Sequence, residues 1–260
     1  MSTAQTIFEV EGPSAILTFN RPEARNAMTW AMYEALVEAC ERVDADSAVA
    51  ALILRGAGGK AFGAGTDISQ FQSFTKAEDA VAYEGRISAV LDRLDRVSKP
   101  TIAQVEGVAA GAGCAIAITC DLRVGTSATT MGIPIARTLG NCVSTGTYAR
   151  LLDIVGPARA KDLLFTGRLV DAEEAHMMGL LSRLAPIDEV GTVVKSLAMT
   201  IASNAPLTVR ATKEMTRRMI AARHHAQSDR DLIEMCYMSD DFKEGVSAFL
   251  AKRPPRWKGR

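Results

Sequence analysis

EGVAAGAGCA, residues 106–115, directly follows the apolar run Thr101–Val105. A buried strand, a turn of small residues and a short apolar stretch over residues 111–118 predict a strand–turn–helix unit. Such a unit places free backbone N–H groups at the start of the helix, where they attract negative charge. Taken alone, the same small residues are equally typical of a tightly packed helix start.

A second stretch of small residues, KAFGAGTDI at 60–68, follows another apolar run at 49–55. Its glycines allow close approach of a ligand to the backbone, and successive turn N–H groups can converge on one oxygen. A flexible loop is the simpler alternative. If both runs belong to one sheet, both turns open at the same edge, and two N–H groups about 3 Å from a thioester oxygen would stabilise an enolate or tetrahedral anion.

Neither stretch fits a dinucleotide-binding loop or a P-loop. The spacing does not match G-x-G-x-x-G, and no acidic residue follows the next strand to hold a ribose. A G-x-x-x-x-G-K-[ST] pattern does not occur either.

Strands and helices alternate in the first half of the chain, and helices alone follow from residue 144. We expect strands at residues 7–10, 15–19, 49–55, 101–105 and 120–125. We expect helices at residues 30–43, 83–97, 111–118, 146–154, 158–166, 172–178, 190–203, 207–223, 230–238 and 241–252. This order predicts an α/β core that carries an α-helical extension.

The composition is that of a globular intracellular protein. Hydrophobic residues make up 48% of the 260 residues, and Lys+Arg and Asp+Glu both number 30, which argues against nucleic acid or an anionic membrane as the partner. No apolar run reaches the ~18 residues of a membrane span, and the first ten residues do not resemble a secretory signal. Five scattered cysteines without C-x-x-C predict free thiols and a cytoplasmic location, and three histidines predict no metal site.

Several motifs together resemble the enoyl-CoA hydratase/isomerase (crotonase) superfamily. In chain order they are NRPEARNAM at 20–28, AFGAGTDI at 61–68, KPTIAQVEG at 99–107, GAGC at 111–114, CD at 120–121, FTGR at 165–168, AEEAHMMGLL at 172–181 and EGVSAF at 244–249. Their order and spacing agree with the family over nearly the whole chain. The resemblance implies a crotonase-like ββα spiral core, residues 1–195, and a C-terminal α-helical trimerisation region, residues 196–260.

The resemblance also implies an acyl-CoA thioester substrate, a role in fatty acid metabolism, and no cofactor beyond the CoA of the substrate itself. The assembly would be a homotrimer or a dimer of trimers. Thr66 and Ala112 match the two backbone N–H groups of the family's oxyanion hole, although Ala112 replaces the usual glycine.

For the CoA moiety, Ala64 and Ile68 match positions along the adenine and pantetheine path. Arg25 matches the segment beside the nucleotide, and Lys258 matches a basic position that reaches the phosphates.

The departures from the family pattern concern proton transfer. Hydratases of this family use two glutamates to activate water and deliver a proton. Ala115 and Ile135 stand at these two positions, and neither side chain can transfer a proton. Standard hydration is therefore not expected.

Four residues are candidates to replace the glutamates. Arg137, Asn141 and Cys142 belong to a polar loop at 135–144, and each fits a role in loop capping or packing equally well. Glu84 lies on the helix after the first turn, where a solvated helix face is the favoured interpretation.

Three functions stay open on this basis. The first is an enoyl-CoA hydratase/isomerase-like lyase or isomerase. The second is another enolate reaction on the same scaffold, namely decarboxylation, C–C hydrolysis or thioester hydrolysis, in which Arg137 would orient a substrate carboxylate. The third is a non-catalytic acyl-CoA-binding protein.

Overall fold

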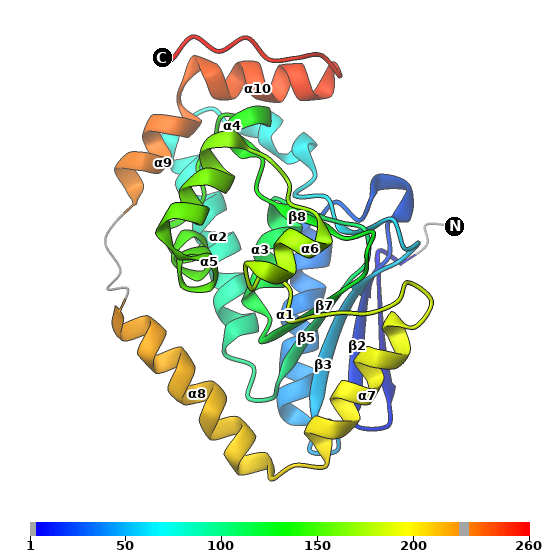
Figure 1. Cartoon of the computed structure of the whole chain (residues 1–260). Coiled ribbons are helices and arrows are strands. Elements are labelled where there is room, and N and C mark those ends of the chain that lie inside the picture. The colour runs from blue at the N-terminus through cyan, green and yellow to red at the C-terminus, as the bar shows by residue number, and fades with distance from the viewer. Residues whose placement is uncertain (1–3, 224–228) are drawn as a thin grey trace.

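The computed structural model describes residues 4–223 and 229–260 and is built on a six-stranded sheet (Figure 1). In spatial order the strands are β1 (Thr6–Glu11), β2 (Ser14–Phe19), β3 (Ala51–Gly56), β5 (Thr101–Val105), β7 (Leu122–Gly125) and β9 (Arg183–Leu184). β1 and β2, at two of the predicted strand positions, form an antiparallel hairpin, and all other neighbours are parallel.

A second, three-stranded parallel sheet was not predicted. It consists of β4 (Ala61–Gly63), β6 (Val108–Ala110) and β8 (Thr130–Gly132), in that order. Each of these short strands follows a strand of the large sheet along the chain, and each is followed by helical structure. This repeated strand–strand–helix unit is the expected ββα spiral.

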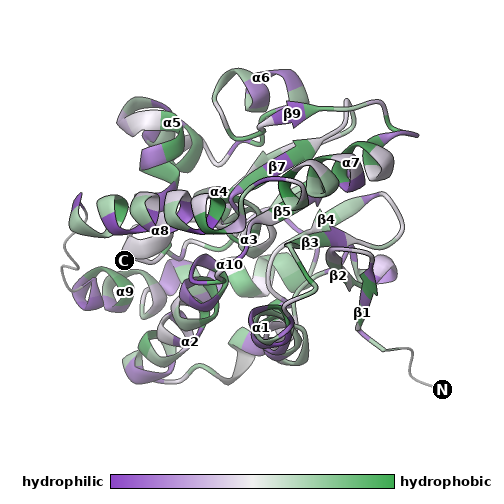
Figure 2. Ribbon diagram, turned by 90° about the horizontal axis from the view of Figure 1, so that it is seen from below, coloured by the Kyte–Doolittle hydropathy of each residue, from purple (hydrophilic) through white to green (hydrophobic). Residues whose placement is uncertain are grey.

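The large sheet is buried on both faces, which explains its continuous apolar strands. Leu17 and Leu54 point into a core beneath the helices α1 (Trp30–Ala45), α2 (Ala77–Asp95) and α3 (Ala112–Thr119). Ile16 and Ile53 point to the other face, which α7 (Val190–Ala202) covers. Figure 2 shows α1 and α7 on opposite sides of the strands.

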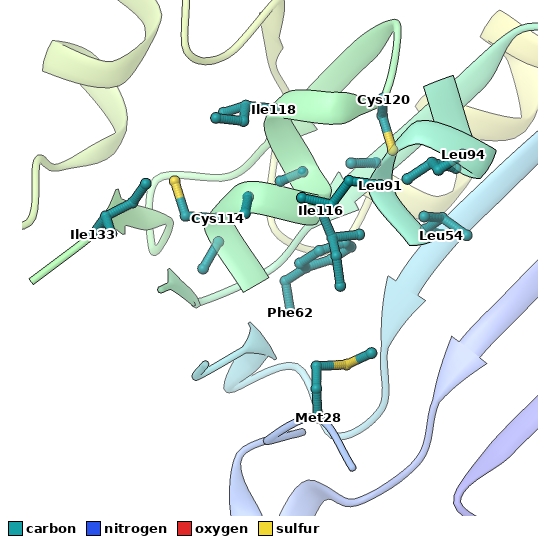
Figure 3. Close-up of a cluster of buried hydrophobic side chains, with 14 of the residues drawn as sticks. Met28, Leu54, Phe62, Leu91, Leu94, Cys114, Ile116, Ile118, Cys120 and Ile133 are labelled. Carbon is teal, nitrogen blue, oxygen red and sulfur yellow. The ribbon is translucent and has the colours of Figure 1, made fainter. Parts of the chain in front are cut away.

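The helix α3 lies inside the larger core (Figure 3). Seven of its eight residues are buried, as expected for a helix that is apolar all round. Ile116 packs among Phe62, Leu54 and Leu91, which come from three other elements. The start of α3 is therefore fixed by its surroundings, which matters for the site described below.

The remaining helices follow in the predicted order, except for α4, which was expected to be loop. They are α4 (Ile135–Thr138), α5 (Thr145–Thr166), α6 (Ala172–Met177), α8 (Pro206–Arg223), α9 (Arg230–Tyr237) and α10 (Asp240–Leu250), with 3-10 turns η1 (Pro22–Ala24) and η2 (Ile68–Ser73). Two helices were expected within α5, and the break does occur at Gly156, whose φ of 76° is not helical.

The expected boundary between residues 195 and 196 falls inside α7. Val194, on one side of it, and Leu197 and Ala198, on the other, pack in the same cluster against the sheet. The helical region thus leaves the core after α7, with α8. Figure 1 shows α8 standing apart from the body, and none of its residues is buried.

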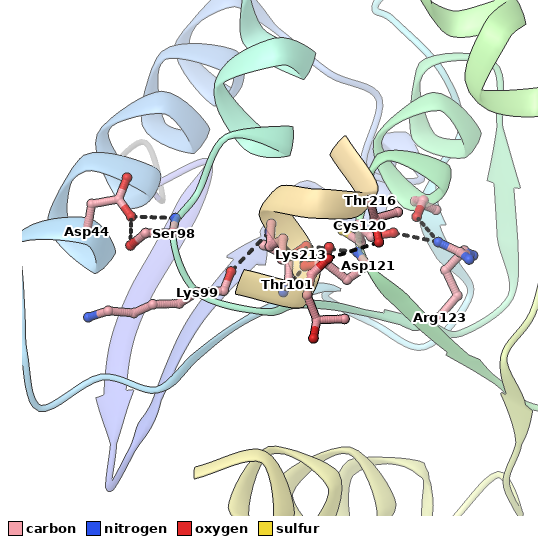
Figure 4. Close-up of polar contacts among 11 residues, drawn as sticks. Asp44, Ser98, Lys99, Thr101, Cys120, Asp121, Arg123, Lys213 and Thr216 are labelled. Carbon is pink, nitrogen blue, oxygen red and sulfur yellow. Dashed lines mark hydrogen bonds and ion pairs between the residues drawn. The ribbon is translucent and has the colours of Figure 1, made fainter. Parts of the chain in front are cut away.

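One polar cluster ties α8 to the sheet (Figure 4). The Lys213 ammonium of α8 contacts an Asp121 carboxylate oxygen at 2.7 Å and the Lys99 carbonyl at 3.1 Å. The same carboxylate oxygen accepts hydrogen bonds from the backbone N–H and the hydroxyl of Thr101, the first residue of β5. Across the described ranges, no helix is long and apolar enough to cross a membrane.

Candidate active site

The two glycine-rich turns lie against each other. They follow β4 and β6, which pair in parallel through Ala61 with Val108 and Gly63 with Ala109. A Cβ atom added to Gly113 would lie 2.0 Å from the carbonyl oxygen of Gly63, and one on Gly111 would lie 3.4 Å from the Cα of Gly65. At Gly113 only glycine allows this approach, and the two turns meet as predicted.

Replacing Gly113 with alanine is expected to destabilise the protein by about 1–3 kcal/mol, because the new methyl group overlaps the Gly63 backbone. Urea unfolding checks this. Gly85→Ala is the matched control, since Gly85 lies within α2 with no atom within 4 Å of an added Cβ. The control is expected to gain up to about 1 kcal/mol from helix propensity. A Gly113→Ala protein as stable as wild type would contradict the packing argument.

The backbone N–H groups of Thr66 and Ala112 remain free for a ligand. Met28 pairs with the peptide groups on either side of Thr66, donating to the Gly65 carbonyl at 2.8 Å and accepting from Asp67 N–H at 2.9 Å. Ala112 is the first residue of α3, where an N–H has no partner within the helix. Within the described residues, neither N–H has a protein acceptor.

Both residues line one cavity of about 140 Å³. Its walls are mainly apolar, from Ile68, Phe71, Ile87, Ile133, Leu139, Val143 and Phe249. A larger cleft of about 1210 Å³ lies between α8 and the body and contains none of the predicted site residues in its walls. The smaller cavity is therefore the candidate active site.

The Glu84 side chain belongs to this cavity, and the expectation of a solvated helix face was wrong. Glu84 is only 7% exposed and is the one carboxylate among the described residues that line the cavity. The hydroxyl of Tyr237, on α9, donates a hydrogen bond to Glu84 Oε1. Asn141 Nδ2 donates in turn to the Tyr237 oxygen at 3.0 Å.

Burial sets the protonation of this carboxyl group. Desolvation raises the pKa of Glu84 to about 7, although the hydrogen bond from Tyr237 acts in the opposite direction. A carboxyl group of that pKa is suited to both accept and release a proton near neutral pH.

Asn141 and Cys142 also line the cavity. The Asn141 Oδ1 atom is buried and has no partner. The Cys142 thiol hydrogen-bonds to Cys236, which raises the pKa of Cys142. It also donates to the Leu232 carbonyl at 3.7 Å, so both loop residues contact α9.

The remaining predicted residues are spread more widely. Ala115 and Ile135 line the cavity, so no carboxylate faces it from either position. The Arg137 side chain is exposed and lies outside the cavity lining. In the described residues, no group of His, Cys, Asp or Glu side chains is arranged to hold a metal ion.

The structure brings together only some of the residues that were expected to contact the CoA moiety. Ala64 and Ile68 line the cavity together with Thr66. Arg25 is exposed and lies next to Ala64, since its carbonyl accepts a hydrogen bond from the Ala64 N–H at 3.1 Å. Lys258 lies apart, in the tail after α10, where its N–H donates to Asp241 at 2.6 Å.

Sequence reasoning missed three tyrosines at the site. Tyr237 holds Glu84, and the hydroxyls of Tyr33 and Tyr83 hydrogen-bond to the Thr66 hydroxyl. Tyr33 and Tyr237 sit on the apolar faces of helices, so their positions predicted burial but not their hydroxyl partners. Glu84 and Tyr237 are 153 positions apart in the sequence, so no local signal indicates their contact.

Comparisons with known proteins identify the family of the chain. The family described as enoyl-CoA hydratase/isomerase matches residues 11–260. The chain is 35% identical over 261 residues to the crotonyl-CoA hydratase of Syntrophomonas wolfei and 34% identical over 260 residues to the short-chain-enoyl-CoA hydratase of Clostridium acetobutylicum, covering 97% of each chain in both pairs.

Solved structures extend the similarity to the whole fold. An enoyl-CoA hydratase/carnithine racemase from Magnetospirillum magneticum is 33% identical with a TM-score of 0.81, covering 100% of this chain and 97% of that chain. A methylmalonyl-CoA decarboxylase in complex with 2-nitronate-propionyl-CoA is 25% identical with a TM-score of 0.91, covering 100% of both chains. From its sequence and its fold alike, the chain belongs to the enoyl-CoA hydratase/isomerase family.

Proposed function

We propose that the protein acts on a short acyl-CoA thioester and stabilises its enolate between the N–H groups of Thr66 and Ala112, with Glu84 as the proton-transfer group. The observation that carries this proposal is the buried Glu84 carboxyl in the same cavity as the two free N–H groups. The relatives named as crotonyl-CoA and short-chain-enoyl-CoA hydratases support a CoA thioester substrate. The small apolar cavity suits a short acyl chain.

The reaction follows from the arrangement. The thioester oxygen accepts hydrogen bonds from both N–H groups, which stabilise the negative charge that develops on it. The Glu84 carboxylate takes the proton from Cα as the enolate forms, and the resulting carboxylic acid returns a proton to the carbon skeleton. No separate cofactor is needed, since the CoA is part of the substrate.

The CoA moiety would leave the cavity past Ala64 and Ile68, with Arg25 and Lys258 available to its phosphates. The contact between Arg25 and Ala64 supports the first part of this path. Positive side chains at the phosphates would contribute to affinity rather than to the chemical step.

Standard two-glutamate hydration is not part of this proposal. Ala115 and Ile135 face the cavity and offer no group that could activate a water molecule. We expect crotonyl-CoA hydration to be far slower than in relatives that carry both glutamates, and a comparable rate would contradict this.

Deuterium exchange tests the proposed function directly. With butyryl-CoA in D₂O, the wild-type protein is expected to exchange the Cα protons, as followed by mass spectrometry. A protein that binds butyryl-CoA without exchanging these protons would be the non-catalytic alternative, and the proposal would be rejected.

Decarboxylation is the second candidate function. The structural similarity is greater to the methylmalonyl-CoA decarboxylase, with a TM-score of 0.91, than to the hydratase/racemase, with 0.81, despite the lower identity. Loss of CO₂ leaves the same enolate, which the protonated Glu84 would then protonate at Cα. Arg137 lies outside the cavity, so it is not placed to orient the substrate carboxylate. The apolar walls would instead desolvate this carboxylate and so favour the loss of CO₂.

The pH dependence separates the two candidates. Exchange of butyryl-CoA needs the Glu84 carboxylate, so its kcat should rise with pH and reach half its maximum near the pKa of about 7. Decarboxylation of methylmalonyl-CoA needs the protonated acid, so its kcat should fall through the same pH. Rates measured between pH 5.5 and 8.5 with both substrates check this, and a flat profile for both would remove Glu84 from either reaction.

We also propose the trimeric assembly of the family. Among the described residues, α8 has no buried side chain, and Leu207, Met215 and Met219 are more than half exposed. Light scattering during gel filtration measures the mass, and a monomer at micromolar concentration would contradict this.

A further inference from the structure

The side chain of Thr66 lies between two tyrosine hydroxyls. Its Oγ1 atom is 2.9 Å from the hydroxyl of Tyr33 and 2.8 Å from that of Tyr83. A threonine hydroxyl has one hydrogen to donate and two lone pairs to accept, so both contacts can be made at once. The residue that offers one of the two anion-binding N–H groups is thereby held from two sides.

The two tyrosines are themselves fixed. Tyr33, on α1, is 1% exposed and Tyr83, on α2, is 8% exposed. Both rings pack edgewise or tilted against Trp30, with ring centroids 5.6 Å apart in each case. Burial raises the pKa of both phenols, so both remain neutral hydrogen-bonding groups at any physiological pH.

The backbone restrains this part of the turn through Met28. The Gly65 carbonyl and the Thr66 N–H belong to one planar peptide group, so the hydrogen bond from the Met28 N–H to that carbonyl also orients the Thr66 N–H. Gly65 adopts a φ of 106°, a conformation open to glycine, which has the greatest backbone freedom of any residue. The Thr66 side chain adds a second restraint on the same residue, through the hydroxyls of Tyr33 and Tyr83.

The helix α2 connects the side-chain contact of Thr66 to the candidate acid, Glu84. Tyr83, which contacts the Thr66 hydroxyl, and Glu84, which faces the cavity, are consecutive residues of α2. The Tyr83 hydroxyl holds Thr66 and the Tyr237 hydroxyl holds the Glu84 carboxyl, so one helix connects the anion-binding residue to the candidate acid.

We propose that Tyr33 and Tyr83 are positioning residues that clamp the Thr66 hydroxyl and hold its N–H in register with Glu84. The proposal rests on the proposed enolate function. The tyrosines do not touch the reacting atoms in this role, and their contribution is to pre-organise the anion-binding group before the charge develops.

Thr66→Val tests the clamp, because valine keeps the shape of the side chain and the backbone N–H but removes the hydroxyl. We expect kcat for Cα exchange of butyryl-CoA to fall about 3–10-fold with KM within twofold, as for loss of about one hydrogen bond in the enolate-forming step. Thr66→Ser keeps the hydroxyl and is expected to remain near wild type.

Tyr33→Phe tests the clamp from outside the cavity, since Tyr33 is not among the lining residues. We expect a similar fall in kcat. The double variant Thr66→Val/Tyr33→Phe should be no slower than Thr66→Val alone, because Thr66→Val already removes the hydrogen bond between Thr66 and Tyr33. Tyr148→Phe is the matched control. Tyr148 lies on α5, and its hydroxyl has no hydrogen-bond partner within the described chain.

A pair of ligands separates the clamp from general damage. Butyryl-CoA has the carbonyl oxygen that the N–H groups bind, and the thioether S-butyl-CoA lacks it. The variants should bind S-butyl-CoA as the wild type does and keep their preference for butyryl-CoA within about twofold, so that the 3–10-fold loss appears in kcat alone. Unfolded or distorted variants would lose both ligands, and this result would overturn a pure positioning role.

The two proposals fail in different ways. If the wild type itself binds butyryl-CoA no better than S-butyl-CoA and exchanges no proton, the anion site is rejected and the clamp with it. If the wild type shows both properties and Thr66→Val and Tyr33→Phe keep them unchanged, the clamp alone is rejected.

Discussion

Replacing Glu84 with glutamine is expected to lower kcat for Cα proton exchange at least about 100-fold, the usual contribution of a positioned general base. Glutamine has nearly the same shape and can still accept the hydrogen bond from Tyr237, but it cannot take a proton. The affinity for butyryl-CoA should change little, because the carboxylate is assigned to proton transfer rather than to binding. Exchange kinetics and calorimetry with the same ligand measure the two effects separately.

Glu78→Gln is the matched control for this variant. Glu78 lies on the same helix, but its side chain is 61% exposed and is paired with Arg230 at the surface. It should leave kcat unchanged. Glu84→Gln with a kcat within threefold of wild type would mean that another group moves the proton, and Cys142 would then be the next candidate in the cavity.

The ionisation of Glu84 also affects the stability of the wild-type protein. Burial raises the pKa of Glu84 from 4.5 to about 7 in the folded protein, so the folded state binds the proton more tightly than the unfolded chain does. The stability is therefore fully present below pH 4.5 and is lost as the pH rises through 7. Because one pKa unit corresponds to 1.36 kcal/mol, the loss is at most about 3 kcal/mol.

Glu84→Gln removes this dependence. Its Tm should be close to that of wild type near pH 4.5, exceed it increasingly up to about pH 7 and keep that difference up to pH 8.5. An active-site substitution that lowers activity and raises stability is the pattern expected of a buried ionisable group kept for its chemistry. A constant difference in Tm over this range would show that the carboxyl group is not desolvated in the folded protein.

The sequence predicted five of the six strands of the large sheet and most of the helices in order, because those elements carry strong local signals. The two-residue β9 and the four-residue α4 were missed. Strand β5 is a five-residue apolar run, and Thr29 caps α1 by accepting a hydrogen bond from the N–H of Met32. The small sheet was missed because its strands are three residues long and made largely of alanine and glycine. Such strands have no alternating pattern and are defined only by pairing with each other.

The two turns of the site were predictable because close contact between them requires glycine. These glycines can be recognised in the sequence even when the segment that they contact is not known. The environment of Glu84 was not predictable, since it depends on residues from α9 and from the loop before α5. Local periodicity placed Glu84 on a helix but could not show that Tyr237 and Asn141 cover it.

Replacing Ala112 with proline is expected to lower kcat about 100–1000-fold, the usual effect of removing one oxyanion-hole donor. Ala112 is the first residue of α3, the position where proline is best tolerated in a helix. Proline restricts the preceding residue, but that residue is Gly111, which has no Cβ to clash. The helix should therefore survive while one of the two N–H groups is deleted.

Ala112→Ser is the matched control, because serine changes the side chain and keeps the N–H. Its kcat should stay within a few-fold of wild type, and far-UV circular dichroism should show the same helix content for both variants. The proline variant should lose far more in kcat than in affinity for S-butyl-CoA, since the N–H acts on charge that develops only in the reaction. If Ala112→Pro retained kcat within tenfold of wild type, the thioester oxygen would have to lie elsewhere, and the pairing of Ala112 with Thr66 could not be the anion site.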